Sequence, residues 1–139
     1  MAIEQFHNPE SPKYSENRHI ATQDKPNFLV IMSDEHGAQF SSTYGHPIIE
    51  TPNMDRLAEQ GVTFDANYCN SPLCIPSRAS FITGQYVSTN EIWDNSKPMP
   101  VDRLTWPYLL RNEGYDTALN GKMHLVGPDP LHGFDKQLS

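Results

Sequence analysis

Residues 71–84 read "SPLCIPSRASFITG", a turn that leads into a helix pattern. Proline is favoured in the first turn of a helix and glycine just past its end, so we expect a helix that begins near Pro76 and stops at Gly84. Cys74 would then lie just before the positive end of the helix, where an anion is favoured. Arg78, about one turn on, adds a guanidinium that suits tetrahedral oxyanions. The alternative is a cysteine packed under a turn, with Arg78 on the surface.

Short apolar runs and helix patterns alternate on both sides of this stretch. Residues 27–33, "NFLVIMS", form a continuous apolar run, which predicts a strand buried on both faces of a parallel sheet. The other expected elements are a helix at 52–60 with Thr51 as its N-cap, an extended segment at 62–69, a helix after Thr105 that ends at Gly114, and a strand at 115–120. The alternation predicts an α/β fold with helices on both faces of the sheet, in which ligands bind beyond the carboxyl ends of the strands.

The composition favours one small, acidic and loop-rich domain. The chain has 139 residues, with 10 basic and 17 acidic side chains that give a net charge of −7. Its 12 prolines exceed the usual share of about 5%. The absence of a basic run argues against nucleic acid and anionic membrane surfaces as partners. No apolar stretch approaches the roughly 20 residues that span a bilayer.

The start of the chain is polar and shows no periodicity, so we expect residues 1–25 to form a flexible or surface-draped arm. This segment lacks the basic-then-apolar order of a secretory signal, so we expect a cytoplasmic protein. Cys69 and Cys74 are then better interpreted as thiols than as a disulfide, although their spacing does not exclude a bridge. The predicted strands are too few for a closed sheet, which suggests part of a larger structure.

Two further clusters of polar residues could bind a ligand or take part in a reaction. Asp34, Glu35 and His36 follow the first predicted strand, and a hard cation would offset the repulsion between adjacent carboxylates. The alternative for this cluster is a solvated acidic loop. In "GKMH", Lys122 and His124 are two residues apart, so in an extended loop both side chains point the same way and could converge on one ligand. Lysine supplies fixed charge, and histidine a hydrogen bond or proton near neutral pH.

Together, the three clusters suit the transfer of a sulfuryl or phosphoryl group. The sequence around them resembles one family. "CIPSRASFITG" is similar to the signature of type I sulfatases of the alkaline phosphatase superfamily, in which the cysteine of Cys-x-Pro-x-Arg is oxidised to Cα-formylglycine. "KPNFLVIMSDEHG" resembles the opening metal-binding strand of that family. "SPLCIPSR", "WDN" and "GKMH" resemble choline-sulfatase-like bacterial members in particular. The resemblance implies that 26–139 is the N-terminal portion of an alkaline-phosphatase-like catalytic domain with a mostly parallel sheet.

The resemblance also implies roles for the nucleophile and the metal. Cys74 would become the formylglycine, whose hydrate is the nucleophile and a metal ligand, and Arg78 would hold its hydroxyl. Asp34 matches the first metal-binding carboxylate, and Glu35 stands where many members have Asp and others Gln. Ca²⁺ is the family's usual ion, with Mn²⁺ and Mg²⁺ as alternatives.

Substrate contacts follow from the same resemblance. Lys122 and His124 would bind the sulfate oxygens, and Asn95 of "WDN" falls where choline-sulfatase-like members place an asparagine that contacts sulfate. Cys69 matches no role and is expected to serve packing. The implied function is hydrolysis of a small-molecule sulfate ester to an alcohol and inorganic sulfate.

Family members are several hundred residues long and carry further metal ligands in their second half. The resemblance therefore implies that the remainder of a sulfatase chain is the partner of this segment, that the segment alone is inactive, and that a homo-oligomer is compatible with it. Two other functions stay open. One is a phosphonate or phosphate ester hydrolase of the same superfamily, which "GKMH" disfavours, and the other is a non-catalytic anion-binding fragment with Cys74 unmodified.

Overall fold

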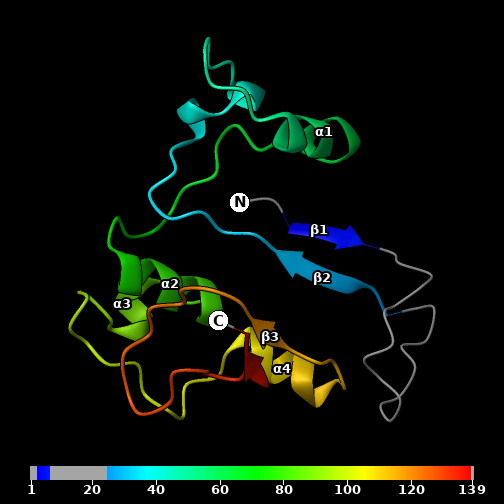
Figure 1. The fold of residues 1–139 in the computed structure, drawn as a ribbon. Coiled ribbons are helices and arrows are strands. Elements are labelled where there is room, and N and C mark those ends of the chain that lie inside the picture. Colours follow the sequence, from blue (N-terminus) through cyan, green and yellow to red (C-terminus); the bar gives the residue numbers. More distant parts are fainter. Residues whose placement is uncertain (1–2, 7–24, 139) are drawn as a thin grey trace. The chain divides into compact units, whose positions relative to one another are not determined.

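The computed structural model describes residues 3–6 and 25–138. The chain divides into two compact units, Met1–Ala66 and Asn67–Ser139, which we describe separately (Figure 1). No helix in the described residues is long and apolar enough to cross a bilayer.

The first unit contains a two-stranded antiparallel sheet of β1 (Ile3–Phe6) and β2 (Asn27–Val30). The register runs from Ile3 opposite Val30 to Phe6 opposite Asn27. β1 lies within residues 1–25, so four residues of the segment expected to form a flexible or surface-draped arm are in a strand. The physical reason is the open edge of β2, whose backbone N–H and C=O groups pair with any extended segment that reaches them.

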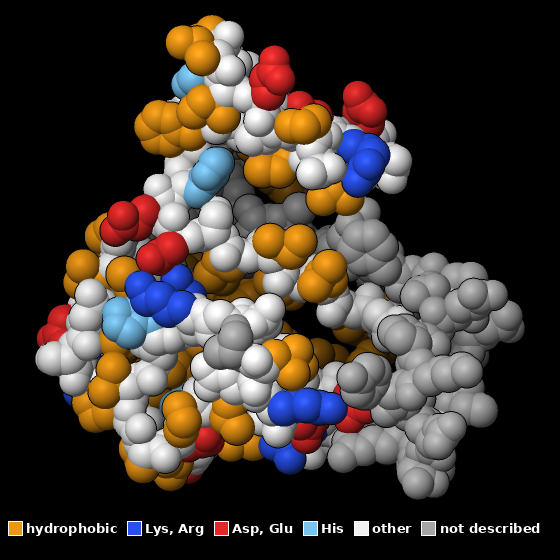
Figure 2. Space-filling view, in the orientation of Figure 1, with side chains coloured by type: hydrophobic (Ala, Val, Ile, Leu, Met, Phe, Trp, Pro, Cys, Tyr) orange, Lys and Arg blue, Asp and Glu red, His pale blue; other side chains and the backbone are white. Residues whose placement is uncertain are grey.

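β2 confirms a strand inside the predicted range 27–33, but its surroundings differ from the prediction. Its pairing with β1 is antiparallel rather than parallel. Phe28 and Leu29 are 42% and 50% exposed, so the strand is not buried on both faces. Burial of a central strand requires neighbouring strands and covering helices, and within this unit β1 is the strand that pairs with β2 among the described residues. Figure 2 shows exposed hydrophobic side chains at several places on one face of the molecule.

A polar network joins the remaining elements of this unit, which are η1 (Ala38–Phe40), η2 (Ser42–Tyr44) and α1 (Pro52–Gln60). α1 begins at Pro52 as predicted, but the Thr51 side chain does not cap it. Thr51 Oγ1 instead accepts a hydrogen bond from the Ser42 N–H at 3.0 Å. Asp55 accepts hydroxyl hydrogen bonds from Ser42 and Thr43, both at 2.6 Å, and these bonds lower the pKa of Asp55. The 3-10 turn is therefore tied to the first turn of α1.

The second unit is built around α2 (Cys74–Thr83). Ile75, Ala79 and Ile82 are fully buried, and their spacing of four and three residues gives one apolar stripe along the helix. The other buried members of this core are Ile92, Met99, Met123, Leu125 and Phe134. Gly84 closes the helix in the left-handed conformation, with φ of 68°, and its N–H donates to the Ser80 carbonyl at 2.9 Å.

Two predictions along this part of the chain need correction. α2 begins at Cys74 rather than near Pro76, because Leu73 takes the N-cap position and Cys74 already has helical geometry. Residues 62–69, predicted to be extended, contain a turn and no strand, since alternation in their sequence is only partial. The short helix α3 (Val87–Asn90) was not predicted, and its four residues carry too little periodicity to be recognised.

The predicted helix after Thr105 and the predicted strand near 115–120 both form. They are α4 (Trp106–Asn112) and β3 (Ala118–Leu119), and β3 pairs in parallel with β4 (Lys136–Gln137). The T-shaped contacts of Trp106 with Phe81 and Phe134, at ring-centroid distances of 5.8 and 5.4 Å, pack α4 against the core.

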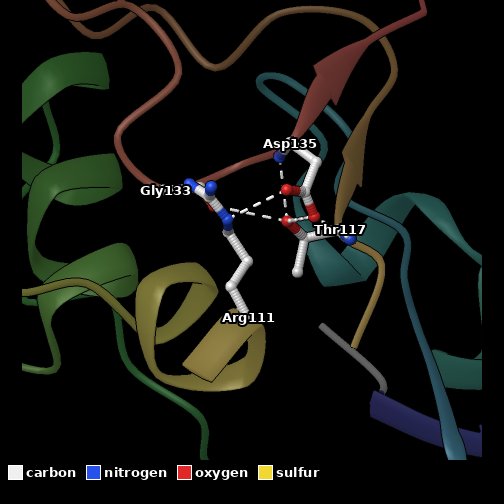
Figure 3. A network of polar contacts seen from close by, with 4 residues as sticks. All are labelled: Arg111, Thr117, Gly133 and Asp135. Atoms are coloured by element: carbon white, nitrogen blue, oxygen red, sulfur yellow. Dashed lines mark hydrogen bonds and ion pairs between the residues drawn. The ribbon is translucent and has the colours of Figure 1, made fainter. Parts of the chain in front are cut away.

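A polar network at Asp135 fixes α4 to the parallel strand pair (Figure 3). The Asp135 carboxylate accepts from Arg111 Nε at 2.9 Å and from the backbone N–H of Thr117 at 2.9 Å. Arg111 Nη1 also donates to the carbonyl of Gly133 at 3.4 Å. The Asp135 carboxylate thus accepts hydrogen bonds from a side chain of α4 and from a buried backbone N–H next to β3.

Replacing Asp135 with alanine should lower the free energy of unfolding by about 1–3 kcal/mol, because the Thr117 N–H would lose its side-chain acceptor while Thr117 stays buried. Urea denaturation followed by circular dichroism measures this change. Lys136→Ala, at the exposed neighbouring position, is the matched control. Equal stabilities for the two variants would contradict the role assigned to the network.

His132 is fully buried, and neither ring nitrogen has a hydrogen-bond partner within the described structure. Burial lowers the pKa of His132, and the nearby charge of Asp129 opposes this shift. Folding therefore favours the neutral form of the ring. In the unfolded chain it takes up a proton below its ordinary pKa of about 6.5.

The sign of the pH effect follows from the lowered pKa. The unfolded chain binds the extra proton, so the stability contributed by neutral His132 is complete above about pH 6.5 and is lost as the pH falls below it, by at most about 1.4 kcal/mol per pH unit. The unfolding free energy should therefore fall less between pH 7.5 and 5.5 in His132→Gln than in the unchanged protein. Urea titrations at both pH values measure the difference, and an identical pH dependence in both proteins would contradict it.

Candidate functional site

The start of α2, where Cys74 lies, contacts Asn95 through the next residue, Ile75. Cys74 is the first helical residue and is half-buried. The N–H of Ile75, one of the helix donors without an intrahelical partner, donates to Asn95 Oδ1 at 3.0 Å. The structure therefore brings together two residues that the sequence places twenty positions apart.

Arg78 connects the same helix to the segment that contains Lys122 and His124. Its Nη1 donates to the backbone carbonyl of Lys122 at 2.6 Å. Arg78 is only 7% exposed, so the alternative that it is a surface side chain is wrong. A buried guanidinium needs hydrogen-bond acceptors to offset its lost hydration, and a carbonyl on the neighbouring segment supplies one.

Lys122 and His124 lie on the exposed side of their segment. Met123 and Leu125 between and after them are buried in the core, so burial alternates along 122–125 as in an extended chain. His124 departs from an ideal strand, because its φ of 57° is left-handed. Histidine is among the residues enriched in this region of backbone space. Both side chains are exposed, and that they leave the same side of the loop stays a prediction.

Asp34, Glu35 and His36 belong to the first unit, where they follow β2 and are exposed. Carboxylate oxygens fit a hard divalent cation by their chemistry. Among the described residues, however, no group of three or more His, Cys, Asp or Glu side chains could hold a metal ion. The donor types therefore fit a metal, and their number falls short of a complete shell.

Cys69 differs from its predicted packing role. It is exposed, and its Sγ lies 2.9 Å from the hydroxyl of Ser77 and 2.9 Å from the carbonyl of Ser71. Cys69 and Cys74 are both free thiols, as predicted. The contact with Ser77 on α2 could not be found from sequence, because it depends on how the turn before the helix folds.

Comparison with known proteins identifies the family. The sulfatase family profile matches residues 26–138. The chain is 42% identical over 118 residues to the choline-sulfatase of Rhizobium meliloti (strain 1021), which covers 85% of this chain and 23% of that protein. The chain belongs to the sulfatase family, and it spans about a fifth to a quarter of the length of such relatives.

Solved structures agree with this assignment. One, described as a complex with its substrate D-glucosamine-2-N,6-O-disulfate, matches with a TM-score of 0.69 and 39% identity over 76% of this chain and 21% of that one. The phosphonate monoester hydrolase of Agrobacterium radiobacter matches with a TM-score of 0.63 and 26% identity over 73% of this chain and 23% of that one. The fold is that of the alkaline-phosphatase-like α/β enzymes, as the sequence predicted.

The hydrogen bond of Arg78 makes the segment 121–125 dependent on α2. In Arg78→Met, which keeps the length of the side chain but removes the donor, amides in this segment should exchange with deuterium at least about tenfold faster, since bonds from charged groups contribute about 1.5–3 kcal/mol. Exchange measured by mass spectrometry tests this. Arg103→Met is the matched control, because Arg103 donates instead to Gln85. Unchanged exchange at 121–125 would contradict the coupling.

Proposed function

We propose that the complete protein containing this chain hydrolyses a sulfate ester to an alcohol and inorganic sulfate. The observation that carries this proposal is the pair of hydrogen bonds, Ile75 to Asn95 and Arg78 to Lys122, which bring two polar loops to the first two turns of α2. The helix start, Arg78 and Lys122 are favourable for an anionic sulfuryl group. Membership of the sulfatase family supports the reaction class.

Cys74 is the proposed nucleophile position. Oxidised to formylglycine and hydrated, it would supply one hydroxyl that attacks sulfur and expels the alcohol. The second hydroxyl would then lose its proton, so that the aldehyde re-forms as the C–O bond to sulfate breaks. This chain would hold residue 74 at the start of a buried helix. The neighbouring Ile75 is buried in the core, and Arg78 lies on the same helix about one turn further on. A nucleophile fixed in this way reacts from a single orientation, which removes part of the entropic cost of reaction.

Lys122, His124 and Asn95 are the proposed contacts to sulfate. All three are exposed in the second unit, on loops that hydrogen bonds tie to α2. Lys122 would supply fixed positive charge, Asn95 an amide donor, and His124 a hydrogen bond or a proton for the departing alcohol.

A divalent cation is the proposed cofactor, with Ca²⁺ as first choice and Mn²⁺ or Mg²⁺ as alternatives. Asp34 and Glu35 would hold it together with the oxygen derived from Cys74, and the cation would lower the negative charge at the site. Ca²⁺ takes 6–8 oxygen ligands, which these residues do not reach. We therefore infer that the remainder of the protein supplies further ligands, and that these 139 residues alone neither bind the ion tightly nor turn over substrate.

The substrate class we propose is the sulfate monoester itself. One similar protein is a choline-sulfatase, and another was solved in complex with a sulfated glucosamine as its substrate, so the alcohols differ. The sulfuryl group is what these substrates share. A phosphonate ester is the second candidate, favoured by the structural match to a phosphonate monoester hydrolase.

Replacing Cys74 with alanine in the complete protein should lower kcat/KM for 4-nitrophenyl sulfate by about 10³-fold or more, as expected for loss of a nucleophile. Initial rates with 4-nitrophenyl sulfate and with a 4-nitrophenyl phosphonate monoester measure activity and substrate class together. Cys69→Ala is the matched control, since this second thiol has no proposed role in the reaction. The mass of the peptide containing residue 74 distinguishes an aldehyde from a thiol.

Each result decides between named alternatives. Faster turnover of the phosphonate would transfer the assignment to the second candidate. A thiol at residue 74 in a protein that hydrolyses neither ester would favour an anion-binding role. Near-normal sulfatase rates in Cys74→Ala would overturn the proposed nucleophile.

A further inference from the structure

We propose that Asp94 is a positioning residue that folds the loop 93–98 and thereby holds the Asn95 side chain at the start of α2. This inference rests on the proposed function, because Asn95 is one of the proposed sulfate contacts. Asp94 itself would not touch the substrate.

Burial of side chains does not determine the conformation of the loop 93–98. Each residue of 93–98 is exposed, whereas Ile92 before it and Met99 after it are buried in the core. The Met99 N–H also donates to the carbonyl of Val126 at 2.8 Å, which anchors the second end of the loop. Both ends are therefore fixed, and the path between them depends on the hydrogen bonds that the loop residues make.

Asp94 accepts three of those bonds. Its Oδ1 accepts from the Ser96 N–H at 2.7 Å, from the Ser96 hydroxyl at 2.6 Å and from the Lys97 N–H at 3.2 Å. An aspartate that accepts from the backbone two residues on forms a tight turn, for which an asparagine can substitute. The hydrogen bonds from Ser96 lower the pKa of Asp94, so the turn and the charged carboxylate stabilise one another.

The turn fixes where Asn95 points. With Asp94 and Ser96 held on either side, Asn95 Oδ1 reaches the Ile75 N–H at 3.0 Å. Because Asn95 Oδ1 is committed to α2, its Nδ2 is the donor that can serve an anion beside Cys74. A displacement of about 1 Å in a positioned group can cost up to about 10²-fold in rate. Loss of the turn should therefore reduce the contribution of Asn95 to the rate without abolishing it.

The experiment compares three variants of the complete protein. Asp94→Ala removes the acceptor, Asp94→Asn keeps an acceptor oxygen and removes the charge, and Asp102→Ala changes another exposed aspartate of the same unit. We expect kcat/KM for 4-nitrophenyl sulfate to fall about 10- to 100-fold in Asp94→Ala. It should stay within about twofold of the unchanged protein in Asp94→Asn and Asp102→Ala, because an asparagine can form the same turn. Hydrogen exchange at the Ile75 amide should be faster in Asp94→Ala alone.

Three results would overturn the inference. An Asp94→Ala enzyme with unchanged rate would show that the turn is not needed. An equal loss of kcat/KM in Asp94→Asn would assign the effect to the charge of the carboxylate. A loss of kcat/KM with unchanged exchange of the Ile75 amide would show that Asp94 does not act through the contact with α2. If the unchanged protein hydrolyses no sulfate ester, the proposed function fails, and the Ile75 exchange still decides whether Asp94 positions Asn95.

Discussion

The second unit depends on the burial of one face of α2. Ile75, Ala79 and Ile82 are fully buried, and the segments around the helix contribute the rest of the core. Full burial of an isoleucine side chain is worth about 1.5–3 kcal/mol, so Ile75 and Ile82 fix the helix firmly. Because Arg78 lies on the same helix and is also buried, its guanidinium requires an acceptor, and the Lys122 carbonyl provides one. The packing that stabilises the unit therefore also determines where the candidate site lies.

Loops rather than strands carry most of the candidate site, and side-chain acceptors give these loops their shape. Asp94 organises the turn beside Asn95, and Asp129 accepts from the N–H groups of Leu131 and His132 in the same manner. A chain with 12 prolines has fewer backbone donors available for regular structure. Aspartate side chains replace part of the missing backbone pairing, which allows irregular segments to hold defined conformations.

Local signals made the helices predictable, whereas contacts between distant segments were not. Proline near the start and glycine past the end gave α1, α2 and α4 to within about two residues. The burial of β2 was predicted wrongly because it depends on neighbours that the local sequence does not specify. The contacts of Ile75 with Asn95 and of Arg78 with Lys122 join residues 20 and 44 positions apart, and no spacing rule connects them. The chemistry of their clusters selected Arg78 and Lys122, and resemblance to the sulfatases selected Asn95. Ile75 was not selected, and folding explains how each pair meets.

In the first unit, too, the positions of candidate functional residues depend on packing, but here the packing is weak. Asp34 and Glu35 follow β2, so their positions are set by a strand whose Phe28 and Leu29 remain largely exposed. A strand with little burial fixes its end weakly, and carboxylates at such an end bind a cation less tightly than preorganised ones, because ordering them costs conformational entropy. Burying β2 under further strands or helices would therefore strengthen the proposed metal binding even without adding a ligand. In the proposed function, packing around β2 and binding of the cation are coupled by the same strand.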